Sequence, residues 1–282
     1  MKKSWKDIVL SIMLYIILAV ILIPAVWLVF SSFRLTKEIN AKPPVWIPSK
    51  LTVEAYQTLF NPTTLGEQSV PFKAYFKNSI TFATAGTLIA LFIGTPAAYA
   101  FARFKFSLKN LTFLFLMLLR AVPGIALGIP LFILYARLKL VDTYQGMIFV
   151  YIAISLPFTV WLMEGFFRSI PRDLDEAAYI DGCGRLQSFL LIDLPLAAPG
   201  FMATAIFIFL YIWNDFAIAY ILTRSLQTKT LPVGLYDFTS EFIVDWRGMC
   251  AMGTIMLIPA IIFTIFSQRQ MIAGLMSGGV KE

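Results

Sequence analysis

Six long apolar stretches divide this chain, and they limit its possible folds more than any other feature. They cover residues 8–30, 79–101, 111–135, 146–163, 200–222 and 250–267. A helix needs about 20 apolar residues to cross a bilayer, and each stretch is close to that length. The chain is 59% hydrophobic and 14% charged, whereas soluble domains are about 45–50% apolar and about 25% charged. We therefore predict an all-α integral membrane protein with six transmembrane helices.

The composition excludes most kinds of active site. Histidine is absent, so imidazole metal sites and nucleophiles that depend on a histidine base are excluded. Cys183 and Cys250 are far apart and lack the clustered spacing of a zinc or iron–sulfur site. We expect no catalytic residue, no metal and no cofactor in this chain. An integral membrane enzyme that uses intramembrane carboxylates and Arg120 is the weaker alternative.

The net charge of +7 has two interpretations. It suits nucleic acid binding, but a membrane protein with basic cytoplasmic loops has the same excess. We favour the membrane interpretation, with the N-terminus inside, because the short loops on that side then hold most of the basic residues. These residues are Lys2, Lys3, Lys6, Arg103, Lys105, Lys109, Arg168, Arg172, Arg185, Arg269 and Lys281. Both termini are therefore expected in the cytoplasm.

This topology predicts three regions. Residues 1–33 form the N-terminal tail and a retained first span, because the apolar run is longer than that of a signal peptide. Residues 34–78 form an external loop with five prolines, which favour turns and extended chain. Residues 79–282 form a core of five spans, with a cytoplasmic loop at 168–199. In the third stretch, four closely spaced residues predict irregular backbone beside a cavity: Pro123, Gly124, Gly128 and Pro130.

The loop between the fourth and fifth stretches is too polar to lie in the membrane. Pro171 suits the first position of a helix, the acidic residues that follow favour its positive end, and Gly182 is a natural stop. A second amphipathic segment covers 185–194 and ends at a proline. We expect two short helices at the inner membrane surface, where Ala177 and Ala178 allow another backbone to approach closely. A solvated connector is the alternative interpretation.

The residue spacing within this loop is highly specific. Glu-Ala-Ala is followed after three residues by a glycine, after nine more by an isoleucine, and after one more by Leu-Pro. The positions are Glu176, Ala177, Ala178, Gly182, Ile192, Leu194 and Pro195. This pattern resembles the EAA motif of permease subunits of ATP-binding-cassette (ABC) importers. Asp181, Phe189 and Pro199 also stand where many sugar-importing members have them. The resemblance implies the type I importer permease (MetI-like) fold, in the inner membrane of a bacterial or archaeal cell.

Shorter strings resemble carbohydrate permeases related to the smaller membrane subunit of the maltose transporter. They lie at 142–146, 213–216, 230–235 and 274–281. Together they imply that the substrate is a sugar or an oligosaccharide. Asp215 stands where many relatives have Glu, and Cys183 where Ala is usual, so the particular substrate is open. The alternatives are another small polar solute, such as a polyol, a glycerol phosphate or an amino-acid-like compound, and a secondary transporter without an ATPase.

The resemblance also implies partners. The chain has no Gly-x-x-x-x-Gly-Lys-Ser/Thr phosphate loop, so ATP and Mg are expected on two partner ATPase subunits. A second permease in a heterodimer, an extracytoplasmic solute-binding protein and membrane lipid are the other expected partners, and nucleic acid is not. The segment from Glu176 to Gly182 is then a coupling helix that docks on one ATPase. Glu176 and Asp181 would supply polar contacts, and helix capping is the alternative role of Asp181.

Charged residues at membrane depth are costly and usually face a protein interior or an aqueous pathway. Arg120, Glu164 and Asp215 are such residues. Hydrogen-bonding and aromatic groups that suit a sugar gather near Asp215. We therefore predict a substrate pathway, or a contact between permeases, formed by Arg120, Tyr211, Trp213, Asn214 and Asp215. A structural contact between Arg120 and Asp215 is the alternative. Glu164 is expected to be interfacial or to pair with Arg168 at i+4.

Overall fold

The computed structural model describes residues 5–43, 45, 48–61, 70–239 and 244–278. The described residues are helical or irregular, apart from an isolated bridge between Thr239 and Val244. Two compact units are present: unit 1 holds residues 1–73 and 234–258, and unit 2 holds residues 74–233 and 259–282. Several residues used above lie outside the described part of the chain, namely Lys2, Lys3, Pro44, Pro62 and Lys281.

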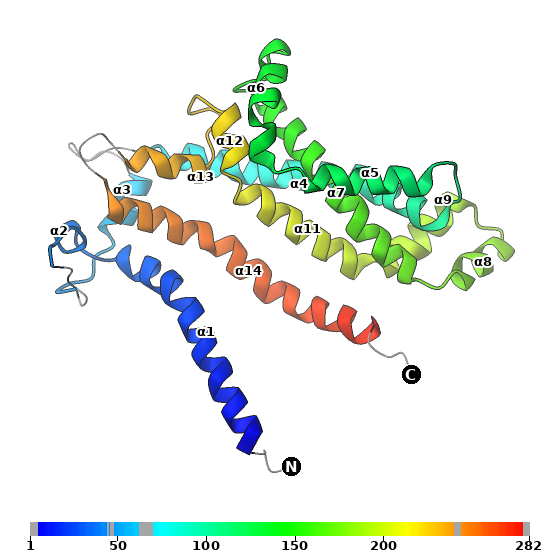
Figure 1. Cartoon of the computed structure of the whole chain (residues 1–282), viewed down its shortest axis with the longest axis horizontal. Coiled ribbons are helices and arrows are strands. Elements are labelled where there is room, and N and C mark those ends of the chain that lie inside the picture. Colours follow the sequence, from blue (N-terminus) through cyan, green and yellow to red (C-terminus); the bar gives the residue numbers. More distant parts are fainter. Residues whose placement is uncertain (1–4, 44, 46–47, 62–69, 240–243, 279–282) are drawn as a thin grey trace. The chain divides into compact units, whose positions relative to one another are not determined.

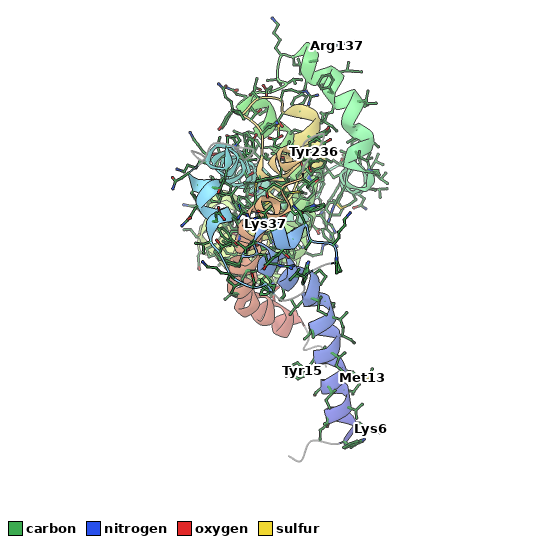
Figure 2. The ribbon with its side chains drawn as sticks, turned by 90° about the vertical axis from the view of Figure 1, so that its left-hand side faces the viewer. Lys6, Met13, Tyr15, Lys37, Arg137 and Tyr236 are labelled. Atoms are coloured by element: carbon green, nitrogen blue, oxygen red, sulfur yellow. The ribbon has the colours of Figure 1, made fainter. Side chains whose placement is uncertain are left out.

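Unit 1 begins with α1 (Trp5–Ser31), which confirms the first predicted span. Nearly all of its side chains up to Trp27 are exposed in this chain. Figure 2 shows Met13 and Tyr15 projecting from different sides of α1, with Lys6 near its N-terminal end. A helix that is apolar all round suits a membrane.

The described part of the predicted external loop contains short helices. They are α2 (Thr36–Ile39) and α3 (Glu54–Phe60). An ion pair between Arg247 Nη1 and Glu54 Oε2, at 2.7 Å, joins α3 to the first turn of α14 (Trp246–Gly278). A 3-10 helix, η3 (Leu235–Phe238), also belongs to unit 1. It follows α13 (Leu231–Gly234). The described prolines of this region, Pro43, Pro48 and Pro71, all lie outside the helices.

Unit 2 is built on three long helices, α4 (Phe72–Arg103), α7 (Tyr144–Ser169) and α11 (Ala198–Trp213). A Cβ atom on Gly94 would lie 2.6 Å from Thr159 Cγ2, so α4 and α7 approach each other more closely than a side chain would allow. The helix α11 also packs on α7. A buried cluster that includes Tyr99 and Phe167 fills the space at one end of these helices.

Four helices are long and apolar enough to cross a membrane, namely α1, α4, α7 and the part of α14 up to Ile265. The number is six if each of two bent helix pairs counts as one span. One bent pair corresponds to the predicted third span. It joins α5 (Lys109–Ala121) to η1 (Gly124–Leu127) and α6 (Gly128–Arg137), with a bend of 91°. The break contains Pro123, so the irregular backbone predicted there is confirmed.

The predicted continuous fifth span over 200–222 is wrong. The helix α11 ends at Trp213, Asn214 is its C-cap, and a separate α12 (Ala217–Leu222) follows. Before α11, the chain bends by 73° between the helical segments Arg185–Leu196 and Ala198–Trp213. The side chain of Asn214 hydrogen-bonds the Leu210 carbonyl at 2.8 Å, which completes the helix end. Hydropathy averaged over a window does not detect such a cap.

Candidate coupling surface and solute pathway

The helix α8 (Asp173–Ile180) contains the Glu-Ala-Ala segment. Within unit 2, α8 and α9 lie at one end, and α6 and α12 lie at the other (Figure 1). The helix begins two residues later than predicted, because Pro171 lies in a turn before it, with its carbonyl accepting the Leu174 N–H at 3.4 Å. Three acidic residues occupy the first turn, Asp173, Asp175 and Glu176. Their charges favour the positive end of the helix.

Gly182 ends this helix, as predicted. Its φ of +86° lies in the left-handed region that glycine adopts without strain. The Gly182 N–H donates to the Tyr179 carbonyl at 3.2 Å, and the Cys183 N–H donates to the Ala178 carbonyl at 2.9 Å. These two hydrogen bonds form a Schellman motif, which satisfies the last carbonyls of the helix. Asp181 is the C-cap residue, and its side chain is exposed.

The two alanines of the motif have different surroundings. Glu176 and Ala177 are exposed, together with Asp181. Ala178 is only 5% exposed, because it faces the interior of this chain. The close approach predicted for a partner backbone is therefore available at Ala177, whereas Ala178 needs a small side chain for packing within the subunit.

The second half of the predicted loop is one helical run. It consists of α9 (Arg185–Ser188), the π-helical η2 (Phe189–Asp193) and α10 (Leu194–Leu196). The prediction that this helix ends at Pro195 is wrong, because Pro195 lies inside α10 and the bend comes at Ala197. A proline is tolerated there since it stands in the first turn of α10. Of the remaining motif residues, Ile192 and Leu194 are half-buried and Pro195 is exposed.

Sequence reasoning missed a buried ionic cluster beside α8. Arg103 ends α4, and its Nε lies 2.9 Å from Asp175 Oδ2 while its Nη2 lies 2.7 Å from Asp193 Oδ1. Ser188 Oγ donates to Asp175 Oδ1 at 2.8 Å. We call these four residues the Arg103 cluster. Their separation in sequence hides them from any spacing pattern, and the one available indication was a lone charge, Asp193, within an apolar run.

Asp215 lies in the break between α11 and α12. Its Oδ2 accepts hydrogen bonds from the Tyr151 hydroxyl and from the Ala219 N–H, both at 3.1 Å. Asn214 is exposed next to it. The break therefore presents polar groups in the middle of an apolar sequence.

The aromatic residues of the predicted pathway separate into two environments. Tyr211 is half exposed. Trp213 is almost fully buried, stacked on Phe209 and edge-on to Phe76, with ring centroids 5.9 Å apart in both pairs. Of these two aromatic side chains, Tyr211 is the one that reaches the surface.

Arg120, on α5, contacts aromatic rings of α7. Its guanidinium lies 4.3 Å from the centroid of Phe158 and 5.1 Å from that of Trp161. Among the described residues, the structure pairs Asp215 with Tyr151 and does not bring it to Arg120. The predicted i+4 ion pair of Glu164 with Arg168 is confirmed.

At the opposite end of unit 2 from α8, Asp142 organises a loop. Its Oδ1 accepts the Arg224 N–H at 2.8 Å, the Ser225 N–H at 3.0 Å and the Thr228 hydroxyl. Partial burial raises the pKa of Asp142, but these hydrogen bonds outweigh burial and leave the pKa below its ordinary value. Asp142 thus fixes the chain between α12 and α13 to the start of α7.

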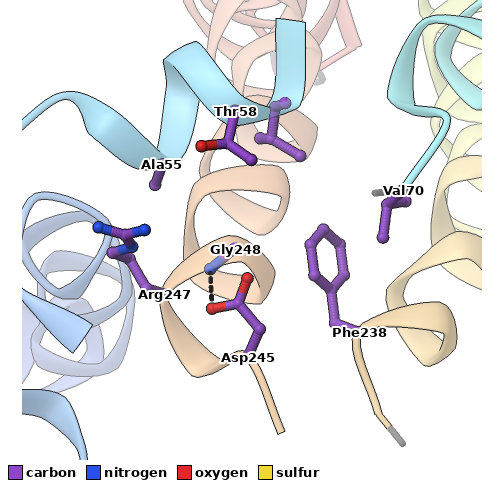
Figure 3. Close-up of a pocket in the computed structure, with 8 residues that line it drawn as sticks. Ala55, Thr58, Val70, Phe238, Asp245, Arg247 and Gly248 are labelled. Carbon is purple, nitrogen blue, oxygen red and sulfur yellow. Dashed lines mark hydrogen bonds between the residues drawn. The ribbon is translucent and has the colours of Figure 1, made fainter. Parts of the chain in front are cut away.

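Unit 1 contains a small cavity of about 10 Å³ (Figure 3). It is lined by Ala55, Thr58, Leu59, Val70, Phe238, Asp245, Arg247 and Gly248. Asp245 Oδ1 accepts the Gly248 N–H at 3.0 Å and so caps α14. Pockets for drug-sized ligands have volumes of about 300–1,000 Å³, so this cavity is too small for an oligosaccharide. The described residues contain no group of three metal-binding side chains.

Comparison with known proteins identifies the family. The family described as "Binding-protein-dependent transport system inner membrane component" matches residues 86–275, which is more than half of the chain. The chain belongs to this family. It is a multi-pass membrane permease subunit, a non-catalytic component of a transport system.

Relatives match this permease over nearly its whole length. The trehalose/maltose transport system permease protein MalG of Thermococcus litoralis is 34% identical over 98% of this chain and 97% of its own. The trehalose transport system permease protein SugB of Mycobacterium tuberculosis is 36% identical over 92% of each chain.

Solved structures share the permease fold. A chain of a bacterial ABC transporter involved in the import of the acidic polysaccharide alginate has a TM-score of 0.77 at 21% identity, and the match covers 95% of this chain and 98% of that one. A chain of the MetNI methionine ABC transporter has a TM-score of 0.56 at 16% identity, over 75% and 99% of the two chains. The predicted MetI-like fold is confirmed.

Proposed function

We propose that this permease forms one half of the membrane pore of an ABC importer for a carbohydrate. The observation that carries the proposal is α8, a short exposed helix that holds the Glu-Ala-Ala segment and ends in a left-handed glycine. The relatives named for trehalose, maltose and diacetylchitobiose support a sugar or oligosaccharide as the substrate. The names of these relatives give no support to the other small polar solutes.

The proposed partners follow from the surfaces of the chain. Two ATPase subunits bind ATP and Mg, and one of them receives α8 through the exposed Glu176, Ala177 and Asp181. The apolar α1 and the exposed break at Asn214 face a second permease in a heterodimer.

A solute-binding protein contacts the external regions, 34–78 and the loop that Asp142 organises. A related alginate transporter, whose structure includes a pentasaccharide-bound periplasmic protein, supports this partner. Both termini and residues 168–199 then face the cytoplasm of a bacterial or archaeal cell, and the five spans of 79–282 form the permease core.

The proposed solute pathway passes the break between α11 and α12. Asn214, Asp215 and Tyr211 supply hydrogen-bonding groups and an aromatic face, and Trp213 supports their wall from inside. Arg120 stands over Phe158 on a separate helix, where it faces the same pathway or the second permease.

The test is uptake into vesicles that contain the complete importer. We expect labelled-sugar uptake that requires ATP, both ATPase subunits and the solute-binding protein. Ala177→Trp is expected to abolish uptake without reducing membrane insertion, because Ala177 is exposed and no packing is lost. Ala177→Ser is the matched control. Uptake that persists without ATP or without the ATPase would overturn the importer assignment.

A further inference from the structure

The coupling helix α8 has little apolar packing of its own. Only Asp175 and Ala178 of its eight residues are buried. Leu174, Tyr179 and Ile180 are exposed, and Ile180 is 86% exposed. A helix that buries so little apolar surface is not fixed in place by the hydrophobic effect alone. Its attachment must therefore come from specific polar contacts.

The Arg103 cluster supplies that attachment. The side chains of Arg103, Asp175 and Asp193 are 6%, 8% and 0% exposed, so their ion pairs are shielded from water. Arg103 Nη1 also donates to the Ile170 carbonyl at 3.1 Å. One guanidinium thus joins the end of α4 to the residue after α7, to α8 and to η2.

The chemistry of arginine suits this role. A guanidinium presents donors in a rigid planar fork, whereas a lysine ammonium is a compact point charge. In this cluster Nη2 hydrogen-bonds Asp193 and Nε forms an ion pair with Asp175, so one arginine attracts carboxylates on two different segments. Buried ion clusters contribute little net stability compared with apolar packing, so a role in geometry explains this one better than a role in stability.

We infer that Arg103 is a positioning residue for energy coupling: it makes α8 and η2 move together with the inner end of α4. Displacement of α8 by an ATPase then reaches the membrane helices and is not lost as bending within the loop. This inference rests on the proposed function, because coupling requires an ATP-driven partner. It adds a residue outside the Glu-Ala-Ala segment that decides whether docking and transport are linked.

The test compares sugar molecules imported per ATP hydrolysed in vesicles that contain the complete importer. Allosteric couplings of this kind are worth about 5- to 150-fold, so we expect Arg103→Gln to lower the ratio by a factor in that range while ATP hydrolysis continues. Arg103→Lys should retain part of the ratio, since an ammonium can hold one carboxylate. Lys105→Gln is the matched control, because Lys105 is an exposed basic residue two positions after Arg103 and loses the same positive charge.

The result that overturns the inference is a proportional loss of uptake and ATP hydrolysis in Arg103→Gln, with an unchanged ratio. If Arg103→Gln does not assemble, the triple variant Arg103→Met, Asp175→Leu, Asp193→Leu decides. It removes every buried charge of the cluster, so it should assemble. Uncoupled hydrolysis in that variant supports the inference, and normal coupling overturns it.

Hydrogen exchange of the α8 amides in the assembled complex is the second measurement, and it does not depend on transport. We expect faster exchange over 173–180 in Arg103→Gln than in the wild type or in Lys105→Gln, and unchanged exchange would contradict the inference. A wild-type importer without ATP-dependent uptake would instead contradict the proposed function. The two failures are therefore distinguishable.

Discussion

Substitution of Gly182 tests whether the shape of the end of α8 matters for docking. The residue has a φ of +86°, and no heavy atom lies within 4 Å of the position that a Cβ would occupy. A side chain here therefore causes no clash and acts only through the backbone. An L-residue in the left-handed region costs about 1–2 kcal/mol, which corresponds to about a 5- to 30-fold change in an equilibrium constant.

We expect Gly182→Ala to raise the apparent Kd of the ATPase for the permease pair by up to about 30-fold. Gly182→Val should reach the upper end, because a β-branched residue is least tolerant of positive φ. Gly182→Asn should have a smaller effect, since asparagine visits the left-handed region more readily. The measurement is a titration of the ATPase against permeases in lipid nanodiscs, with sugar uptake measured in parallel.

Gly184→Ala is the matched control two residues away. Gly184 has a φ of −76°, and its nearest contact to an added Cβ is Gln187 Oε1 at 3.6 Å, so alanine is accommodated. The reasoning is refuted if Gly182→Val binds the ATPase as tightly as Gly184→Ala does. Equal weakening by both variants would also refute it, because the backbone argument separates the two positions.

Three further predictions concern packing and pH. Asp142→Ala should destabilise the complex by about 1–3 kcal/mol in thermal unfolding. Because the pKa of Asp142 is lowered, the stability it contributes is present above its ordinary pKa of about 4 and is lost as the pH falls through the lowered value. Gly146→Ala should abolish assembly, measured by gel filtration, because its Cβ would lie 2.1 Å from the Leu140 carbonyl oxygen. Glu54→Gln should lower the melting temperature, whereas Glu54→Asp should recover part of it, because the buried Arg247 then loses the charge of the Glu54 carboxylate.

The sequence predicted the continuous spans better than the broken ones. Hydropathy located α1, α4, α7 and α14, because a bilayer imposes one length and one polarity on a spanning helix. The closely spaced prolines and glycines near Pro123 also marked the 91° bend correctly. The break at Asn214 was missed, since two polar residues hardly change the average over a long apolar window.

The candidate site was also predicted only in part from the sequence. Local backbone chemistry allowed the glycine stop of α8 to be predicted, because a Schellman motif depends on neighbouring residues. The position of Pro195 within a helical run was not predictable in this way, since it follows a π-helical segment. The Arg103 cluster depends on three distant segments meeting, and the lone charge of Asp193 in an apolar run does not show which residues it meets.

The opposite surroundings of Ala177 and Ala178 have a consequence for evolution and for engineering. Replacements at Ala178 are limited by this polypeptide alone, so compensating changes should occur within the same gene. Replacements at Ala177 are limited by the ATPase in the proposed complex, so compensating changes should occur in a different gene. Adapting this permease to a foreign ATPase should therefore begin at Ala177 and leave its neighbour unchanged.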